Sequence, residues 1–360
     1  MLFILGAYRG QNCLIMPELK NQEESPLKEK RPKGNAWKSL VAKYQKPNAL
    51  RASWQLINTL GAYAVVLAAI YFTLGTSLWL TSGLIVIGGG LVVRIFTISH
   101  DCGHGSFFAS KRANSIVGFI TGVLSLTPYQ HWRWEHARHH ATSGDLDRRG
   151  MGDVWVMTVQ EFLDATPWTR FCYRVARHPV ALLVAGPLFL FLINNRYTTK
   201  GAGNVERLSI YGTNLCILLL AVGMSWLVGF QTYLWIHLAI IMVSGSSGVW
   251  LFYVQHQFED VYWERGKKWD FLSAALGGSS FYKLPRVLQW FSGNIGFHHI
   301  HHLSARIPNY NLEACHNSDP LFHQVKPLTF RDSIRCFGYH LLDEEAGKMI
   351  SFRQFSKRAA

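Results

Sequence analysis

Residues 293–312 read GNIGFHHIHHLSARIPNYNL and contain four of the sixteen histidines of this 360-residue chain within five positions. Two further histidine clusters with related spacings lie upstream. We call the three clusters box 1, box 2 and box 3 in chain order; their patterns are H-x-x-x-H, H-x-x-H-H and H-x-x-H-H. Their members are His100 and His104 in box 1, His136, His139 and His140 in box 2, and His298, His301 and His302 in box 3.

The spacing of these histidines predicts a metal centre. Residues three and four apart share one face of an α-helix, so each box can direct two or three imidazoles toward one point. A structural zinc site uses four ligands, commonly with cysteine among them. Eight converging imidazoles therefore predict two metal ions. Imidazole binds zinc, copper, iron and nickel, so the ligand type alone leaves the metal open.

The composition favours a membrane protein. Hydrophobic residues make up 49% of the chain and charged residues only 16%, which is unusual for a soluble enzyme. The six cysteines form no C-x-x-C pair, so neither a zinc ribbon nor a disulfide scaffold is indicated. We expect reduced thiols on a cytosolic side.

Two long blocks without Lys, Arg, Asp or Glu predict four transmembrane helices. Residues 53–93 can form two spans of about 20 residues with a turn near Gly75, and residues 208–248 can form two more around Gly229. Basic residues lie outside these blocks. The positive-inside rule therefore places both termini and all three boxes on the cytoplasmic side.

Two shorter apolar runs, 116–126 and 180–193, have basic residues on both sides and about half the length that a span needs. We expect helices that lie in or dip into the cytoplasmic leaflet. Pro187 inside the second run favours a broken helix over a straight span. If either run crossed the membrane, box 2 would lie on the opposite side from box 1.

The predicted fold is an all-α integral membrane protein with two helical hairpins, short interfacial helices and a cytoplasmic helical cap that holds the metal centre. Polar, lysine-rich residues from Met16 to Arg51 show no helical periodicity and predict an arm along the membrane surface. No signal peptide is recognisable, and either Met1 or Met16 can be the start. The expected organisation is an arm at 1–52 and one domain at 53–360, with hairpins at 53–98 and 208–254, boxes 1 and 2 within 100–140, and box 3 and the cap at 255–360.

Further polar residues near the boxes are candidates for the same site. His256 follows the predicted fourth span as His100 follows the second, and is either a ninth ligand or a hydrogen-bonded histidine at the interface. Carboxylates can accept the N–H of a ligating ring, or can be ordinary solvated charges. Those nearest to the boxes in sequence are Asp101, Glu135, Asp145, Asp147, Glu259 and Asp260. A metal site beside lipid suits oxygen-driven attack on an acyl C–H bond, for which iron is the natural metal.

The boxes and their surroundings resemble the membrane fatty acid desaturases. The resemblance lies in HDCGHGSF at 100–107, HWRWEHARHHATSGDLDRRGMGDVW at 131–155 and SFYKLPRVLQWFSGNIGFHHIHHLSARIPNY at 280–310. It is strongest to the bacterial acyl-lipid branch, which includes the Δ5 phospholipid desaturases of bacilli and the Δ12 acyl-lipid desaturases. It extends from about residue 53 to the C-terminus.

This resemblance implies a non-haem di-iron enzyme of the bacterial cytoplasmic membrane. Such an enzyme introduces a cis double bond into acyl chains of membrane phospholipids, with O2 and two external electrons. The eight box histidines then take the ligand roles, and a ninth histidine outside the boxes, which such enzymes commonly have, supports His256. His131, Asn294 and His299 lie beside the boxes and can support ligands or hold water. Double-bond position, chain length and head group stay open.

The electrons must come from a partner, because the chain has neither the H-P-G-G haem motif nor a nucleotide-binding glycine motif. The net charge of +14 fits an acidic ferredoxin or flavodoxin, and it equally fits anionic lipid head groups. We expect no nucleic-acid partner. A di-iron hydroxylase or ketolase would use similar boxes, although HHLSARIPNY after box 3 favours a desaturase. A metal transporter would place its ligands inside the spans, which these boxes do not do.

Overall fold

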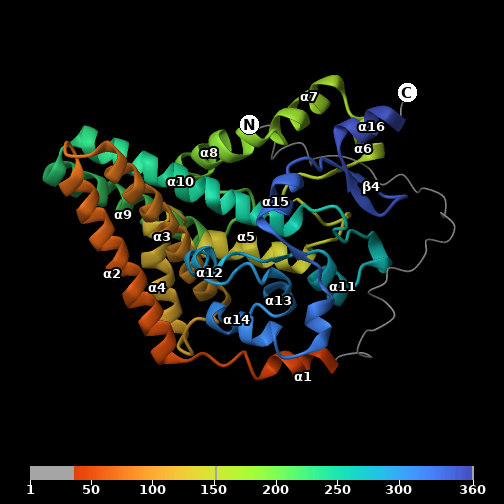
Figure 1. The fold of residues 1–360 in the computed structure, drawn as a ribbon, viewed down its shortest axis with the longest axis horizontal. Helices are drawn as coiled ribbons and strands as arrows, with labels where there is room; N and C mark the ends of the chain where they lie inside the picture. The colour runs from red at the N-terminus through yellow and green to blue at the C-terminus, as the bar shows by residue number, and fades with distance from the viewer. Residues whose placement is uncertain (1–35, 151, 359–360) are drawn as a thin grey trace.

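Four long apolar helices form two hairpins in the computed structural model, which describes residues 36–150 and 152–358. They are α2 (Ala49–Thr73), α3 (Leu78–His104), α9 (Asn204–Val228) and α10 (Phe230–His256). Both hairpin tips lie at the left of Figure 1. The tips contain Gly75 and Gly229, whose φ angles of 81° and 84° suit glycine. These helices confirm the four predicted spans and both predicted turns.

Helix α3 packs between α2 and α10 and runs toward the metal centre. Small residues permit the close contact with α10, because a Cβ on Gly89 would lie 2.4 Å from a methyl carbon of Val243. Ile70, Ile236 and Ile240 are buried beside this contact. The C-terminal ends of α3 and α10, which carry box 1 and His256, are thereby held side by side.

The first short apolar run forms α4 (Lys111–Leu124), which packs back along the box 1 end of α3. The Ser99 hydroxyl donates to the Gly118 carbonyl at 2.9 Å, and Gly118 also lies against the ring of Tyr129. Fourteen residues extend about 21 Å, which is less than the hydrocarbon core of a bilayer. The chain therefore returns to the side of box 1 before box 2 begins.

The second short run is irregular but continuous at Pro187, where π-helix passes directly into α-helix, and the sharp bend lies before the run instead. It consists of η1 (Ala181–Ala185), one turn of π-helix, α8 (Gly186–Leu192) and η2 (Asn194–Arg196). The preceding α7 (Pro167–Ala176) is bent by 69° from this segment. Helix α8 packs on α10, where a Cβ on Gly245 would meet Pro187 at 2.7 Å. Its depth in the leaflet stays a prediction.

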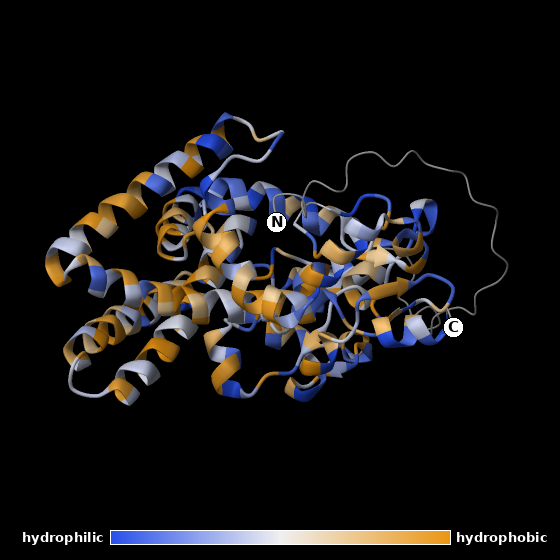
Figure 2. Cartoon of the chain, turned by 90° about the horizontal axis from the view of Figure 1, so that it is seen from above, coloured by the Kyte–Doolittle hydropathy of each residue, from blue (hydrophilic) through white to orange (hydrophobic). Residues whose placement is uncertain are grey.

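The rest of the chain forms a cap on the box 1 side, and Figure 2 shows apolar hairpins on the left and a more polar cap on the right. Its other helices are α1 (Ala36–Ala42), α5 (Tyr129–Thr142), α6 (Val159–Asp164), η3 (Gly266–Lys268), α11 (Phe271–Gly277), α12 (Arg286–Phe291), α13 (His298–Leu303), α14 (Asn309–His316), η4 (Pro320–Gln324), α15 (Phe330–Cys336) and α16 (Phe352–Arg358).

Five very short strands supplement the helices, and the sequence pattern did not reveal them. Their bounds are β1 (Met157–Thr158), β2 (Phe281–Tyr282), β3 (Pro327–Leu328), β4 (Leu341–Asp343) and β5 (Lys348–Ile350). One small sheet has the order β1-β4-β5, with β1 parallel to β4 and β5 antiparallel to it; β2 and β3 form a parallel pair. Both sheets tie distant segments of the cap together.

The N-terminal arm differs from the prediction, since residues 36–42 form α1. Trp37, Leu40 and Val41 of this helix pack on the apolar core of the cap, so tertiary contacts stabilise a helix that has no clear sequence signal. The first span then begins at Ala49, capped by the Asn48 side chain. Residues 1–35, with both candidate start methionines, lie outside the described residues.

Candidate metal centre

Four helix segments bring the predicted histidines to one place. Box 1 is the last turn of α3, box 2 lies on α5, His256 ends α10, and box 3 lies on α13. Helix α5 crosses the end of α3, where Trp132 lies against Gly103 and its ring stacks on that of His136 at 4.4 Å. The last residues of two spans thus meet two cap helices.

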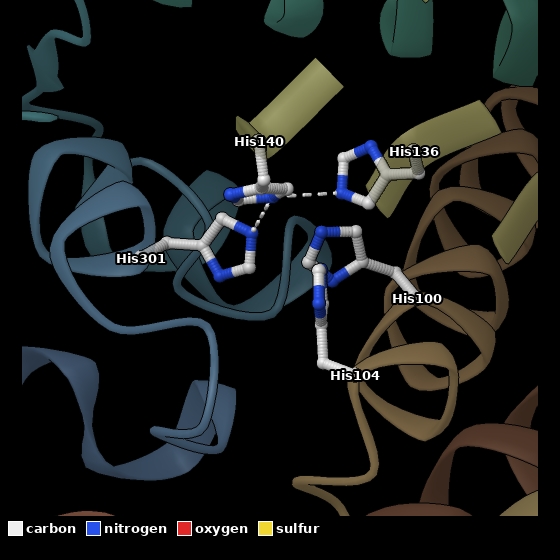
Figure 3. A group of neighbouring side chains, drawn as sticks. All are labelled: His100, His104, His136, His140 and His301. Carbon is white, nitrogen blue, oxygen red and sulfur yellow. Dashed lines mark hydrogen bonds between the residues drawn. The ribbon is translucent and has the colours of Figure 1, made fainter. Parts of the chain in front are cut away.

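Five of the histidines form a first group, shown in Figure 3. One nitrogen from each lies within 4.8 Å of the corresponding nitrogen of every other member. The members are His100 and His104 from α3, His136 and His140 from α5, and His301 from α13. The Nε2 atom of His140 lies 3.0 Å from the Nε2 atoms of both His136 and His301.

The other four histidines form a second group beside the first. His139, His256 and His302 each offer a nitrogen within 4.8 Å of the others. The Nε2 atom of His298 is 2.9 Å from that of His256, which places His298 in the same group. The rings of His140 and His302 stack with their centres 4.2 Å apart, and this contact joins the two groups. The structure therefore brings together all nine histidines that were predicted as metal ligands.

The spacing of these nitrogens fits metal ions better than hydrogen bonds. A neutral imidazole nitrogen either donates or accepts one hydrogen bond, so Nε2 of His140 cannot satisfy the Nε2 atoms of both His136 and His301. Two nitrogens bound at right angles to an ion, each about 2.1 Å from it, lie about 3.0 Å apart. The buried Nε2 atoms of His104 and His302 also have no hydrogen-bond partner among the described residues. Both groups therefore have the donor set and spacing that metal ions require.

Burial keeps the cap imidazoles in the form that binds metals. Desolvation, followed by the charges of neighbouring imidazoles, lowers the pKa of five of them well below the ordinary value. They are His136, His140, His298, His301 and His302. A neutral ring has a free lone pair, so these side chains are ready to coordinate at neutral pH.

Comparison with known proteins identifies the family. A family model described as fatty acid desaturase matches residues 77–328. The chain belongs to the fatty acid desaturase family. This confirms the resemblance on which the sequence interpretation relied, and the matched region contains all three boxes and His256.

Three bacterial desaturases illustrate the range of similarity within the family. This desaturase is 45% identical over 313 residues to a fatty acid desaturase of Bacillus subtilis (strain 168), covering 87% of this chain and 89% of that protein. It is 26% identical over 323 residues to an sn-1 oleoyl-lipid 12-desaturase of Synechocystis sp., covering 86% of each. It is 28% identical over 236 residues to an sn-1 acyl-lipid omega-3 desaturase (ferredoxin) of Nostoc sp., covering 62% of this chain and 63% of that protein.

Two carboxylates of the desaturase lie outside the two groups and each accept a hydrogen bond from a histidine within one of them. Asp101 accepts from Nδ1 of His100 at 3.0 Å, and Asp153 accepts from Nδ1 of His139 at 2.6 Å. Asp101 was among the predicted supporting residues, whereas Asp153 was missed. Gly152, with a φ of 74°, packs against His139 and turns the chain so that Asp153 reaches the ring. Such bonds fix the tautomer and leave Nε2 free for a metal.

The other carboxylates near the boxes have different partners. Asp145 holds Arg148 at 2.5 Å, and Asp147 pairs with Arg265 at 2.9 Å. Glu259 accepts from the Tyr339 hydroxyl at 2.9 Å. Glu135 accepts from Thr199 and lies 3.8 Å from His131. Asp260 has no contact that bears on the histidine groups. None of these contacts reaches a histidine of either group.

The remaining box-adjacent residues lie beside the site. His131 accepts from the backbone N–H of Thr199 at 3.4 Å. The Asn294 amide donates to the Asn309 carbonyl at 3.2 Å, and thereby joins the two flanks of box 3. His299 points to the other side of α13, where its Nε2 lies 3.1 Å from Nδ1 of His316. Burial lowers the pKa of His299 well below its usual value and that of His316 to about 4.

Proposed function

We propose that this desaturase introduces a cis double bond into acyl chains of membrane phospholipids, in an O2-dependent reaction at two irons held by the nine histidines. The observation that carries the proposal is the pair of adjacent imidazole groups where the ends of two spans, α3 and α10, meet the cap. An acyl chain in the neighbouring leaflet is close to such a site. The acyl-lipid enzymes among the relatives support the same substrate class.

The iron pair, when bound, supplies the O2 chemistry that removes hydrogen from an unactivated C–H bond. The protein residues prepare the site for it. Asp101 and Asp153 hold the Nδ1 protons of His100 and His139, so that both Nε2 lone pairs face inward. Close burial of box 3 excludes bulk water from this region.

The overall reaction removes two hydrogen atoms, that is two protons and two electrons, from a CH2–CH2 unit of the acyl chain. O2 takes these, together with two further electrons and two protons, and becomes two waters. The two further electrons come from an external donor, for which a ferredoxin or flavodoxin is the natural class. The Nostoc relative carries ferredoxin in its name, and the net charge of +14 suits an acidic carrier.

The same charge distribution supports a cytoplasmic site in a bacterial inner membrane. Lys and Arg are absent from residues 53–93 and 208–264, which include both hairpin tips, and flank the histidine side of the spans. Ferredoxins and flavodoxins are soluble cytoplasmic carriers, so a donor of this class could reach the metal centre from that side.

Metal analysis of the purified protein tests the proposal. We expect about two irons per chain, because each imidazole group suits one ion. His139→Ala and His301→Ala, which remove one ligand from each group, should abolish desaturation and lower the iron content while the protein still inserts. His237→Ala is the control, since this histidine contacts Tyr233 on α10 and no group member. Active protein with one zinc and no iron would contradict the proposal.

A further inference from the structure

Arg94 is a cation within the α3 span. It precedes His100 by six residues, which is about 9 Å of helix toward the membrane interior. Its side chain is buried, with 7% of the residue exposed, and no carboxylate of the described residues forms an ion pair with it. A charge at this depth is costly and usually has a specific task.

The contacts of Arg94 join α3 to α2 and α12. Its Nε donates to the Thr59 hydroxyl of α2 at 3.0 Å, and its Nη1 donates to the carbonyl of Trp290. The guanidinium also lies over the Trp290 indole, 4.1 Å from the ring centre. One side chain thus holds both the backbone and the ring of Trp290, near the end of α12.

Neighbouring positions on the same face of α3 extend this contact. Thr97 donates to the Ser292 carbonyl at 3.1 Å, and Gly90 lies against the ring of Phe291. Gly293, with a φ of 57°, approaches Thr97 so closely that a Cβ would meet its methyl group at 2.8 Å. The segment before box 3 therefore contacts α3 at three positions along one face, Gly90, Arg94 and Thr97.

The segment after box 3 is held by the same face one turn further on. Asp101 accepts from the backbone and side-chain N–H groups of Asn309 at 2.6 and 2.9 Å. Its other oxygen holds His100 of box 1. Helix α3 therefore carries box 1 and also grips both flanks of box 3.

Helix α12 has little other support. Val287, Leu288 and Trp290 are 67%, 43% and 40% exposed, which fits an apolar helix that meets lipid. Among the described residues, Gly90, Arg94 and Thr97 on α3 supply polar and close contacts on its protein side.

We infer that Arg94 is a positioning residue that fixes box 3 against box 1 from within the membrane. The inference rests on the proposed ligand set. If box 3 moves, the first group keeps four imidazoles and loses His301. The second group loses His298 and His302 and keeps only His139 and His256. The second ion is therefore the one that depends on Arg94.

Iron content distinguishes this role from general stabilisation. Arg94→Met keeps a long apolar side chain that a membrane tolerates, and should lower iron from about two to about one per inserted chain, with activity reduced at least about tenfold. Arg94→Lys keeps a cation near the indole and should recover part of the lost iron. Arg196→Met is the matched control, because Arg196 bonds to Asn214 and Leu126 instead. It should keep wild-type iron.

Each outcome decides the inference. Full iron in Arg94→Met overturns it, and lost activity with full iron and a raised KM for phospholipid would assign Arg94 to lipid binding instead. If Arg94→Met does not accumulate, Thr97→Val removes the next contact without a change in size and should lower iron in the same way; full iron there overturns the inference. A wild-type protein without iron would contradict the proposed function itself, so the two failures are distinguishable.

Discussion

At the scale of single residues, three histidines of the centre are held through Nδ1 by different acceptors. His100 donates to Asp101 and His139 to Asp153, whereas His256 donates to the Gly278 carbonyl at 3.2 Å. A carboxylate makes the ring a stronger donor to a metal than a carbonyl does, because its full charge stabilises the developing positive charge on the imidazole. The two groups thus each contain one carboxylate-supported histidine.

Asp153 provides a direct test of this support. We expect Asp153→Asn to lower iron affinity and activity by about 10- to 100-fold, because the amide keeps the shape and loses the charge. Asp147→Asn is a suitable control, since Asp147 lies in the same segment and pairs with Arg265 at the surface. Iron titration of both variants by mass spectrometry measures the effect. Equal affinities would mean that the Asp153 charge has no role at the centre.

A residue's place in the site could be predicted from the sequence where it depends only on spacing along one helix. The convergence of the box histidines could be predicted from their spacing on one helix face, and that of His256 from its position after a span. Asp153 could not, because its approach to His139 depends on the turn at Gly152. That glycine is visible in the sequence, but its φ of 74° is set by packing against α5. Asp147 and Glu259, which are nearer to the histidines in sequence than Asp153 is, are directed to other partners.

At the scale of elements, two of the membrane-spanning helices position histidines of the metal centre. Helices α3 and α10 each have 27 residues and end in a histidine of the site. Close contact at Gly89 fixes their relative position far from the centre. Since two of the four segments that supply histidines are membrane helices, the site is positioned by the bilayer-spanning bundle as well as by the cap.

The proposed orientation makes a topology prediction. Reporter tags at Gly75 and Gly229, which lie in the two tight turns, should be read outside the cytoplasm. Tags at Asp147 and at both chain ends should be read inside, because basic residues remain on the cytoplasmic side. A reporter pair such as alkaline phosphatase and green fluorescent protein measures this. An outside signal from Asp147 would show that α4 crosses the membrane.

Elements were predictable where one physical signal dominated. A block without charges long enough for two spans determines a hairpin almost alone, and the structure confirms both. Helix α1 and the two small sheets carry no such signal. Each forms because distant parts of the cap pack on it, as Leu341 of β4 does with Met157 of β1. Where the local preference of a segment is weak, tertiary contacts decide its secondary structure, and those contacts cannot be predicted from a single sequence.

At the scale of the whole molecule, an apolar bundle and a polar cap meet at the metal centre, as Figure 2 shows for the two halves. The apolar surface continues past the spans onto the short helices. Trp168 of α7 and Val287 of α12 are 66% and 67% exposed. Under the proposed function, these exposed side chains extend the lipid-facing surface toward the cap.

This arrangement predicts that the substrate is an acyl chain of intact phospholipid. A long chain is already in an apolar medium in the bilayer, where each buried CH2 contributes about 0.8 kcal/mol. Its transfer to an apolar binding site therefore costs little. Chains labelled within pre-formed phospholipid should be desaturated without hydrolysis and re-esterification, as mass spectrometry of the lipids would show. The control is the same chain supplied as a coenzyme A or acyl carrier protein thioester. If the thioester is converted faster in the same membranes, the acyl-lipid assignment fails while the desaturase family assignment stands.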